Sequence, residues 1–99
     1  MALQVKWTEN ALEDYRKVVY YLLEAWSIEI ASKFIDLLEE RLERLSIFPE
    51  IGIQSSKNRE IRAIVITKHN KLYYRNTKDY IEVLSIFDTR QNPQKNKYD

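Results

Sequence analysis

Residues 27–49, SIEIASKFIDLLEERLERLSIFP, decide the fold. Within them, apolar residues recur at alternating steps of three and four, at Ile28, Ala31, Ile35, Leu38, Leu42 and Leu45. This spacing predicts an α-helix with one apolar stripe, and so regular a seam suits packing along a second helix at a shallow angle. Ser27 is a typical N-cap residue. Because Pro49 disfavours helical geometry in the residue before it, we expect the helix to end near Phe48.

The residues on the N-terminal side predict a partner helix. Apolar residues again recur at steps of three and four, at Ala11, Tyr15, Val18, Leu22 and Trp26. Thr8 is suited to cap this helix, with Glu9 in its first turn. The link between the two helices is so short that they should form an antiparallel hairpin. Before the first helix, residues 3–7 alternate apolar and polar side chains as a half-buried strand does.

On the C-terminal side the periodicity changes from that of a helix to that of strands. Residues 50–58 contain the only glycine, Gly52, and are expected to form a loop. Three segments have the composition of strands, with β-branched or aromatic residues or with apolar and polar residues in alternation. They are residues 61–66, 71–75 and 81–87. The predicted order is β-α-α-β-β-β. This is an α+β fold, with the helix hairpin packed on one face of a small antiparallel sheet and the other face turned to solvent.

Length and composition narrow the possible functions. We expect residues 1–99 to form a single domain with a polar C-terminal tail over 88–99. The chain has no cysteine and only one histidine, His69, so we expect no disulfide, metal site or cofactor. The N-terminus lacks the apolar run of a signal peptide, and no stretch approaches the length of a membrane span. A cytoplasmic protein is therefore expected.

The net charge of +1 conceals an asymmetry along the chain. Residues 1–56 carry six basic and ten acidic side chains, whereas residues 57–99 carry ten basic and five acidic ones. A basic half indicates a surface that faces an anion, although small domains also show uneven charge by chance. The cations expected to share one positive surface on or beside the sheet are Arg62, Lys71, Arg75 and Arg90. Strand alternation places two of them, Lys71 and Arg75, on the same face.

Several segments in a fixed order resemble one family of proteins. They are Trp7, Phe48-Pro49-Glu50-Ile51-Gly52, Ile61-Arg62, Leu72-Tyr73-Tyr74-Arg75, Ile81-Glu82-Val83-Leu84 and Arg90-Gln91-Asn92-Pro93. Over residues 3–95 the chain resembles the RelE/ParE toxins of type II toxin–antitoxin systems. This resemblance implies the β-α-α-β-β-β fold and a cognate antitoxin encoded beside the toxin.

The resemblance implies one of two activities. RelE-like members cut messenger RNA on the ribosome, whereas ParE-like members poison DNA gyrase. The chain is more similar to ParE-like toxins, which share the proline–glycine break, a Tyr-Arg pair like Tyr74-Arg75, and an ending like Arg90-Gln91-Asn92-Pro93. Many of these toxins carry histidine where this chain has Asp88. The resemblance thus favours a plasmid-stabilisation toxin that inhibits gyrase by protein contact, without enzymatic activity, and is neutralised by its antitoxin.

The RelE-like alternative would make the chain a metal-independent endoribonuclease with the ribosome and messenger RNA as partners. Cleavage through the 2′-hydroxyl needs cations for the charged transition state and groups that transfer protons. Lys71 and Arg90 match two arginine positions of those enzymes, and Tyr98 lies slightly later than their catalytic tyrosine. These three residues are the catalytic candidates under that alternative. A non-toxic relative that only binds its antitoxin is a third possibility.

Other residues have ordinary structural explanations. His69 falls in a predicted hairpin turn, where a solvated side chain is expected. Arg75 can pair with Glu82 across a hairpin. Trp7 and Trp26 are expected to be core residues at the ends of the first helix.

Overall fold

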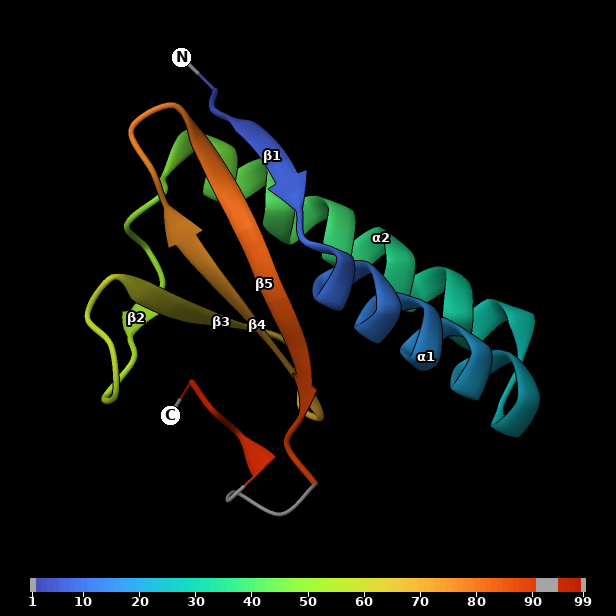
Figure 1. Ribbon diagram of the computed structural model, residues 1–99. Helices are drawn as coiled ribbons and strands as arrows, with labels where there is room; N and C mark the ends of the chain where they lie inside the picture. The colour runs from blue at the N-terminus through green and yellow to red at the C-terminus, as the bar shows by residue number, and fades with distance from the viewer. Residues whose placement is uncertain (1, 91–94, 99) are drawn as a thin grey trace.

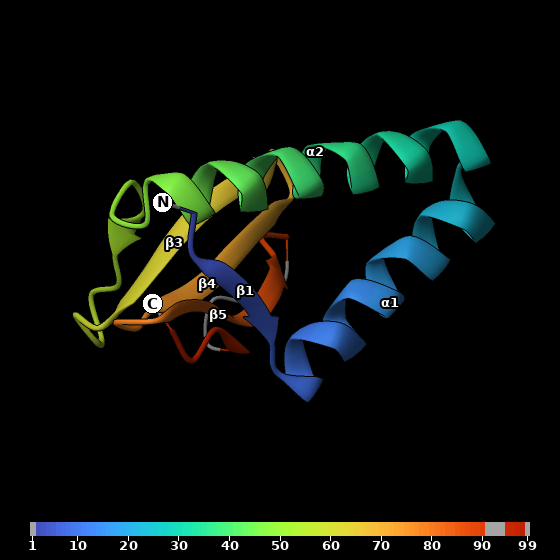
Figure 2. The same cartoon turned by 90° about the horizontal axis from the view of Figure 1, so that it is seen from above.

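The computed structural model describes residues 2–90 and 95–98. Two helices lie side by side along one face of a five-stranded sheet (Figure 1). Seen from above, they meet at their link and diverge away from it (Figure 2). The elements are β1 (Gln4–Trp7), α1 (Glu9–Ala25), α2 (Ile28–Ile47), β2 (Ile53–Gln54), β3 (Ile61–Thr67), β4 (Asn70–Asn76) and β5 (Tyr80–Asp88).

The predicted helix boundaries are confirmed. The Thr8 side chain accepts a hydrogen bond from the backbone N–H of Ala11 at 3.1 Å and caps α1. The Ser27 side chain accepts one from Ile30 N–H at 3.1 Å and caps α2. The second helix ends at Ile47, and Phe48 is its C-cap, directly before the proline. Short polar side chains therefore satisfy N–H groups that have no partner within their helices.

The α+β fold with a helix hairpin on one face of the sheet is confirmed, with two differences in the sheet itself. The strand order is β1-β5-β4-β3-β2, and β1 runs parallel to β5, so the sheet is mixed and not wholly antiparallel. A short strand, β2, also forms inside the expected loop and pairs with β3. The parallel pairing of β1 with β5 joins segments that are far apart in the sequence. Local periodicity does not encode such a pairing.

The two faces of the sheet are buried by different parts of the chain. Leu72, Tyr74 and Val83 pack under the helices against Phe34 and Leu38. This arrangement follows the predicted alternation in β4. The opposite face was expected to meet solvent, and here the structure corrects the prediction.

On that opposite face Tyr73 is fully buried, together with Ile61 and Ala63. Tyr98 packs against this second cluster. The C-terminal segment therefore covers part of the face that alternation alone would leave open. In the part of the chain that the structure describes, no helix is long and apolar enough to cross a membrane.

Candidate functional site

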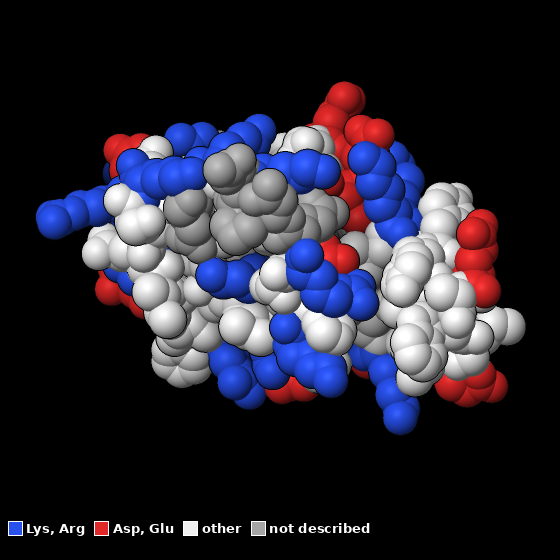
Figure 3. All heavy atoms as spheres, turned by 90° about the horizontal axis from the view of Figure 1, so that it is seen from below, with Lys and Arg blue, Asp and Glu red and all other residues white. Residues whose placement is uncertain are grey.

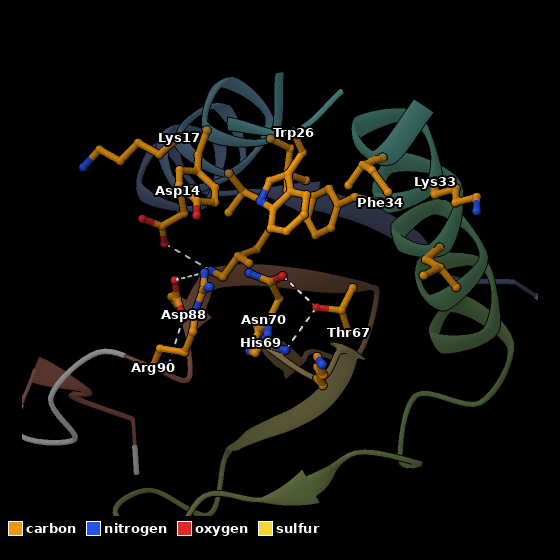
Figure 4. Close-up of a pocket in the computed structure, with 17 residues that line it drawn as sticks. Asp14, Lys17, Trp26, Lys33, Phe34, Thr67, His69, Asn70, Asp88 and Arg90 are labelled. Carbon is orange, nitrogen blue, oxygen red and sulfur yellow. Dashed lines mark hydrogen bonds and ion pairs between the residues drawn. The ribbon is translucent and has the colours of Figure 1, made fainter. Parts of the chain in front are cut away.

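A cleft of about 510 Å³ opens between the helix hairpin and one end of the sheet (Figure 4). We call it the helix–sheet cleft. Its apolar lining comes mainly from the helices: Val18, Leu22, Trp26, Ile30, Phe34 and Leu37. Its charged and polar lining comes from both layers: Asp14, Lys17, Lys33, Thr67, Lys68, His69, Asn70, Asp88 and Arg90. An apolar wall with charged groups around it is typical of a binding site.

Trp26 was expected to be a core residue, and the structure shows that this was wrong. Its side chain is 65% exposed and lines the cleft at the end of α1. Tyr21, on the same helix, is also exposed and also lines the cleft. Residues 18–26, VVYYLLEAW, contain more apolar side chains than one packed stripe requires. That excess is the sequence signal for this exposed surface.

The floor of the cleft is the tight turn between β3 and β4. Thr67 Oγ1 lies 2.8 Å from Asn70 Oδ1, to which it donates, and it accepts a hydrogen bond from the N–H of His69. The carbonyl of His69 in turn accepts from the N–H of Thr89 at 2.9 Å. His69 therefore lies in the turn, as predicted, and its half-buried side chain lines the cleft. These bonds fix the turn against the end of β5.

Arg90 lies on the helix side of this end of the sheet and is paired with Asp88. Its Nε and Nη2 donate to the two carboxylate oxygens at 3.1 and 3.0 Å, and its backbone N–H donates at 2.9 Å. These bonds hold the pKa of Asp88 below its usual value. The guanidinium carbon lies 5.9 Å from the ring centre of Tyr21 on α1. Arg90 thus reaches the cleft with its charge partly balanced by its neighbour.

Asp14 joins α1 to β5 beside the same cleft. Its carboxylate accepts hydrogen bonds from Ser85 Oγ at 2.8 Å and from the N–H of Ile86 at 3.1 Å. The register between β4 and β5 shifts nearby, between Tyr73 and Tyr74. Such a bulge leaves strand N–H groups without a ladder partner, and a side-chain acceptor can take one. Asp14 is therefore a structural anchor within the cleft wall.

At the opposite end of the sheet Arg62 has a structural role. Its Nη1 donates to the carbonyls of Glu50 at 3.1 Å and Gly52 at 2.7 Å. Tyr74, its partner across β3 and β4, donates its hydroxyl to the Pro49 carbonyl at 2.8 Å and accepts from Gly52 N–H at 3.0 Å. Burial raises the pKa of Tyr74. These two side chains hold the loop that follows α2.

The four cations expected on one surface do not gather at one site, although Arg62 and Arg75 line one hollow together. Lys71 and Arg75 share the face turned away from the helices, because they lie opposite Phe87 and Glu82 of β5. Arg75 pairs with Glu82 at 2.7 Å, as predicted, and this contact raises the pKa of Arg75. Arg62 lies on the helix-covered face, opposite Tyr74, and Arg90 lines the cleft. In the view from below, Lys and Arg side chains are spread widely, while the end formed by the hairpin shows mainly uncharged side chains with acidic ones at its edge (Figure 3).

The three catalytic candidates of the nuclease alternative are likewise divided. Lys71 Nζ lies 5.7 Å from the ring centre of Tyr73, and the Tyr98 ring stacks on that same ring. Both therefore lie on the face away from the helices. Arg90 points toward α1 on the other side. Among the described residues, no group of three or more His, Cys, Asp or Glu side chains is placed to hold a metal ion.

One protein-family model matches most of the chain. The sequence model of the ParE toxin of the parDE type II toxin–antitoxin system matches residues 5–93. Among curated proteins, none matches the chain significantly.

Solved structures show the same fold at low identity. The chromosomal ParDE system of Pseudomonas aeruginosa superposes with a TM-score of 0.73 at 19% identity, covering 88% of this chain and 96% of that chain. The YoeB dimer of Staphylococcus aureus superposes with a TM-score of 0.64 at 15% identity, covering 92% of this chain and 100% of that chain. The YoeB–YefM complex from Staphylococcus aureus superposes with a TM-score of 0.57 at 18% identity, covering 88% of this chain and 97% of that chain.

Proposed function

We propose, from the premise that this chain belongs to the ParE toxin family of type II toxin–antitoxin systems, that it inhibits growth by binding DNA gyrase and is neutralised by an antitoxin. The antitoxin is expected to be a small protein encoded in the adjacent reading frame. We further propose that one of its segments docks in the helix–sheet cleft. Plasmid stabilisation is the physiological role that such a pair would serve.

The lining of the cleft supports antitoxin docking there. Apolar surface is exposed around the link between the helices. The exposed fractions are 65% for Trp26, 74% for Ile28 and 39% for Ile30. Exposed apolar clusters of this kind mark protein-interaction sites on small soluble domains. Lys17 and Lys33 add positive charge beside them. An amphipathic segment with apolar anchors and acidic side chains would match both features.

The separation of the nuclease candidates supports protein contact over RNA cleavage. Transition-state stabilisation requires donors and proton-transfer groups around one phosphate. Here Arg90 is paired with Asp88 and faces α1, while the Tyr98 ring is stacked on Tyr73 across the sheet. This separation is the observation that carries the choice of gyrase over messenger RNA.

Antitoxin docking can be tested with matched surface variants. The tagged chain is incubated with the purified product of the adjacent reading frame, and the dissociation constant is measured. Trp26→Ala should weaken binding at least tenfold, since exposed aromatic anchors dominate such interfaces. Ile53→Ala is the control, because Ile53 is 80% exposed but lies on β2, away from the cleft. Equal losses for both variants would place the docking site elsewhere.

The target is tested separately. The purified chain should inhibit supercoiling by purified gyrase, and induction in a bacterial host should break DNA while leaving messages intact. Lys71→Ala and Tyr98→Phe should retain growth inhibition, because the proposed inhibition acts by protein contact and needs no catalytic group for RNA cleavage. Ribosome-dependent message cleavage that either variant abolishes would replace gyrase by RNA as the target.

A further inference from the structure

Tyr73 is fully buried although it belongs to the sheet face turned away from the helices. The Tyr98 ring covers it, with ring centres 5.1 Å apart and planes inclined by 26°. Asn96 Nδ2 donates to the Tyr73 hydroxyl at 2.7 Å. Ile61 and Ala63 complete the buried cluster beneath. One short C-terminal segment therefore provides the cover that the helices provide on the other face.

The same segment is held through its backbone. Ser55 Oγ donates to the carbonyl of Tyr98, and Lys57 Nζ donates to the carbonyl of Asn96 at 2.8 Å. Asn96 Oδ1 accepts from the N–H of Tyr98 at 3.0 Å, which fixes a local turn. Backbone carbonyls are present in every peptide, so the sequence-specific contacts are one aromatic ring and one carboxamide two residues earlier.

We propose that this sheet face is a peptide-binding surface, and that residues 95–98 occupy it in cis. It would accept a protein segment of the form Asn-x-aromatic from a partner, in the turn that Asn96 and Tyr98 now adopt. Tyr73 supplies the stacking platform and the hydroxyl acceptor, while Ser55 and Lys57 supply the backbone donors. The groups that Ser55 and Lys57 now contact are main-chain carbonyls, which any peptide in the same turn would present.

Because residues 95–98 already occupy this surface, a partner segment can bind only when they leave it. A tethered segment has an effective concentration in the millimolar range, so a free segment of equal intrinsic affinity competes poorly. Loss of the Tyr98 ring removes the stacking contact and the apolar area that hold the segment in place. The surface then becomes open to a partner. This inference is independent of the identity of the toxin's target.

The absence of cysteine from the sequence permits a direct test. Ala63→Cys places a single thiol in the buried cluster against which Tyr98 packs, at a position that is 8% exposed. The matched control is Val65→Cys, on the same strand and the same face but 56% exposed. Maleimide labelling of the Ala63→Cys chain should accelerate at least tenfold when Tyr98→Ala is added. Labelling of the Val65→Cys chain should not change.

The second arm asks whether the open surface takes a peptide. The free peptide Lys-Asn-Lys-Tyr-Asp, with the sequence of residues 95–99, is added to the Ala63→Cys chain that also carries Tyr98→Ala. The peptide should slow labelling saturably, and the same peptide with alanine in place of tyrosine should not. With Tyr98 intact the peptide should have no effect, because the cis segment holds the site.

Three results would overturn the proposal: no acceleration by Tyr98→Ala, no protection by the peptide, or equal protection by a short single-stranded RNA. If Ala63→Cys prevents folding, hydrogen exchange of the β3 and β4 amides in the cysteine-free chain makes the same comparison. Those amides should exchange faster with Tyr98→Ala and slow again on addition of the peptide. Unchanged exchange would count against the proposal in the same way.

Discussion

Arg62 and Arg90 lie at opposite ends of the sheet and have different kinds of partners. Arg62 donates to the carbonyls of Glu50 and Gly52 and thereby orders the loop after α2. Arg90 pairs with a carboxylate two residues away, and its side chain remains half exposed beside a cleft. Charge alone made the two residues equivalent in the sequence. The difference teaches that the groups an arginine faces, more than its place in a basic set, decide between a structural and a binding role.

The largest effect is expected at Gly52, in the loop that Arg62 holds, because the space around its Cα is filled. A Cβ on Gly52 would lie 2.6 Å from Tyr74 Oη and 3.0 Å from the carbonyl of Ala63. Gly52→Ala should therefore displace the tyrosine and its hydrogen bonds and lower the free energy of unfolding by about 2–4 kcal/mol. Urea denaturation measures this loss. Ile51→Ala, at an exposed neighbour, should cost less than about 1 kcal/mol. Similar costs for both would show that the close approach is unimportant.

The Tyr74 hydroxyl is expected to have the next largest effect. It bridges the N–H of Gly52 and the carbonyl of Pro49 within a fully buried side chain. Tyr74→Phe keeps the ring but leaves both backbone groups without their partner, which should cost about 1–3 kcal/mol. Tyr20→Phe is the control, since Tyr20 is exposed, and it should leave the urea midpoint unchanged. A neutral Tyr74→Phe would mean that water replaces the hydroxyl.

A matched pair of arginine variants tests the comparison itself. Arg62→Ala should lower the free energy of unfolding by about 1–2 kcal/mol, because two backbone carbonyls lose a charged donor. Arg90→Ala should lower it by much less, since only a half-exposed ion pair with Asp88 is lost, and should instead weaken antitoxin binding. Binding is read from the salt dependence of the dissociation constant, since rim charges act mainly through association. If Arg90→Ala destabilises the fold as much as Arg62→Ala, the proposed division of roles is wrong.

The sequence predicted those features that depend on local periodicity and on single caps. The helix starts at Thr8 and Ser27 and the break at Pro49 follow from side-chain chemistry within a few residues. The Arg75–Glu82 pair follows from a hairpin register that the turn fixes. These interactions join residues that are close in sequence, which is why they could be predicted from the sequence alone.

The remaining features depend on contacts between distant segments. The cleft brings together α1, α2, the β3–β4 turn and the end of β5, so its lining could not be predicted from any single stripe. Tyr98 reaches Tyr73 through bonds to Ser55 and Lys57, which are polar residues in a loop without periodicity. Arg62 faces loop carbonyls whose position depends on where α2 ends. Long-range placement of polar side chains is thus the part that the local pattern leaves open.

The smallest effect is expected from Asp88, the carboxylate that pairs with Arg90 at the cleft end of the sheet. Its pKa is lowered in the folded chain by hydrogen bonds from Arg90. A carboxyl group with a lowered pKa stabilises the fold above its unfolded-state pKa of about 3.9, and that contribution is lost as the pH falls through the folded-state value. Asp88→Asn should therefore be slightly less stable than the native chain at pH 7 and equally stable well below pH 3. Urea midpoints over this range measure the difference.

The same substitution should act in the opposite direction on binding. With Asp88→Asn, Arg90 loses its intramolecular carboxylate and becomes available to an acidic partner segment in the cleft, so antitoxin affinity should rise modestly and with a steeper salt dependence. In an Arg90→Ala background, Asp88→Asn should change the stability and its pH dependence less than in the native chain, because the guanidinium is gone while the backbone N–H of residue 90 still donates to the carboxylate. A gain in affinity that persists without Arg90 would show that Asp88 itself repels the partner. Asp88 would then not act by neutralising Arg90, and the contrast between the two ends of the sheet would rest on Arg62 alone.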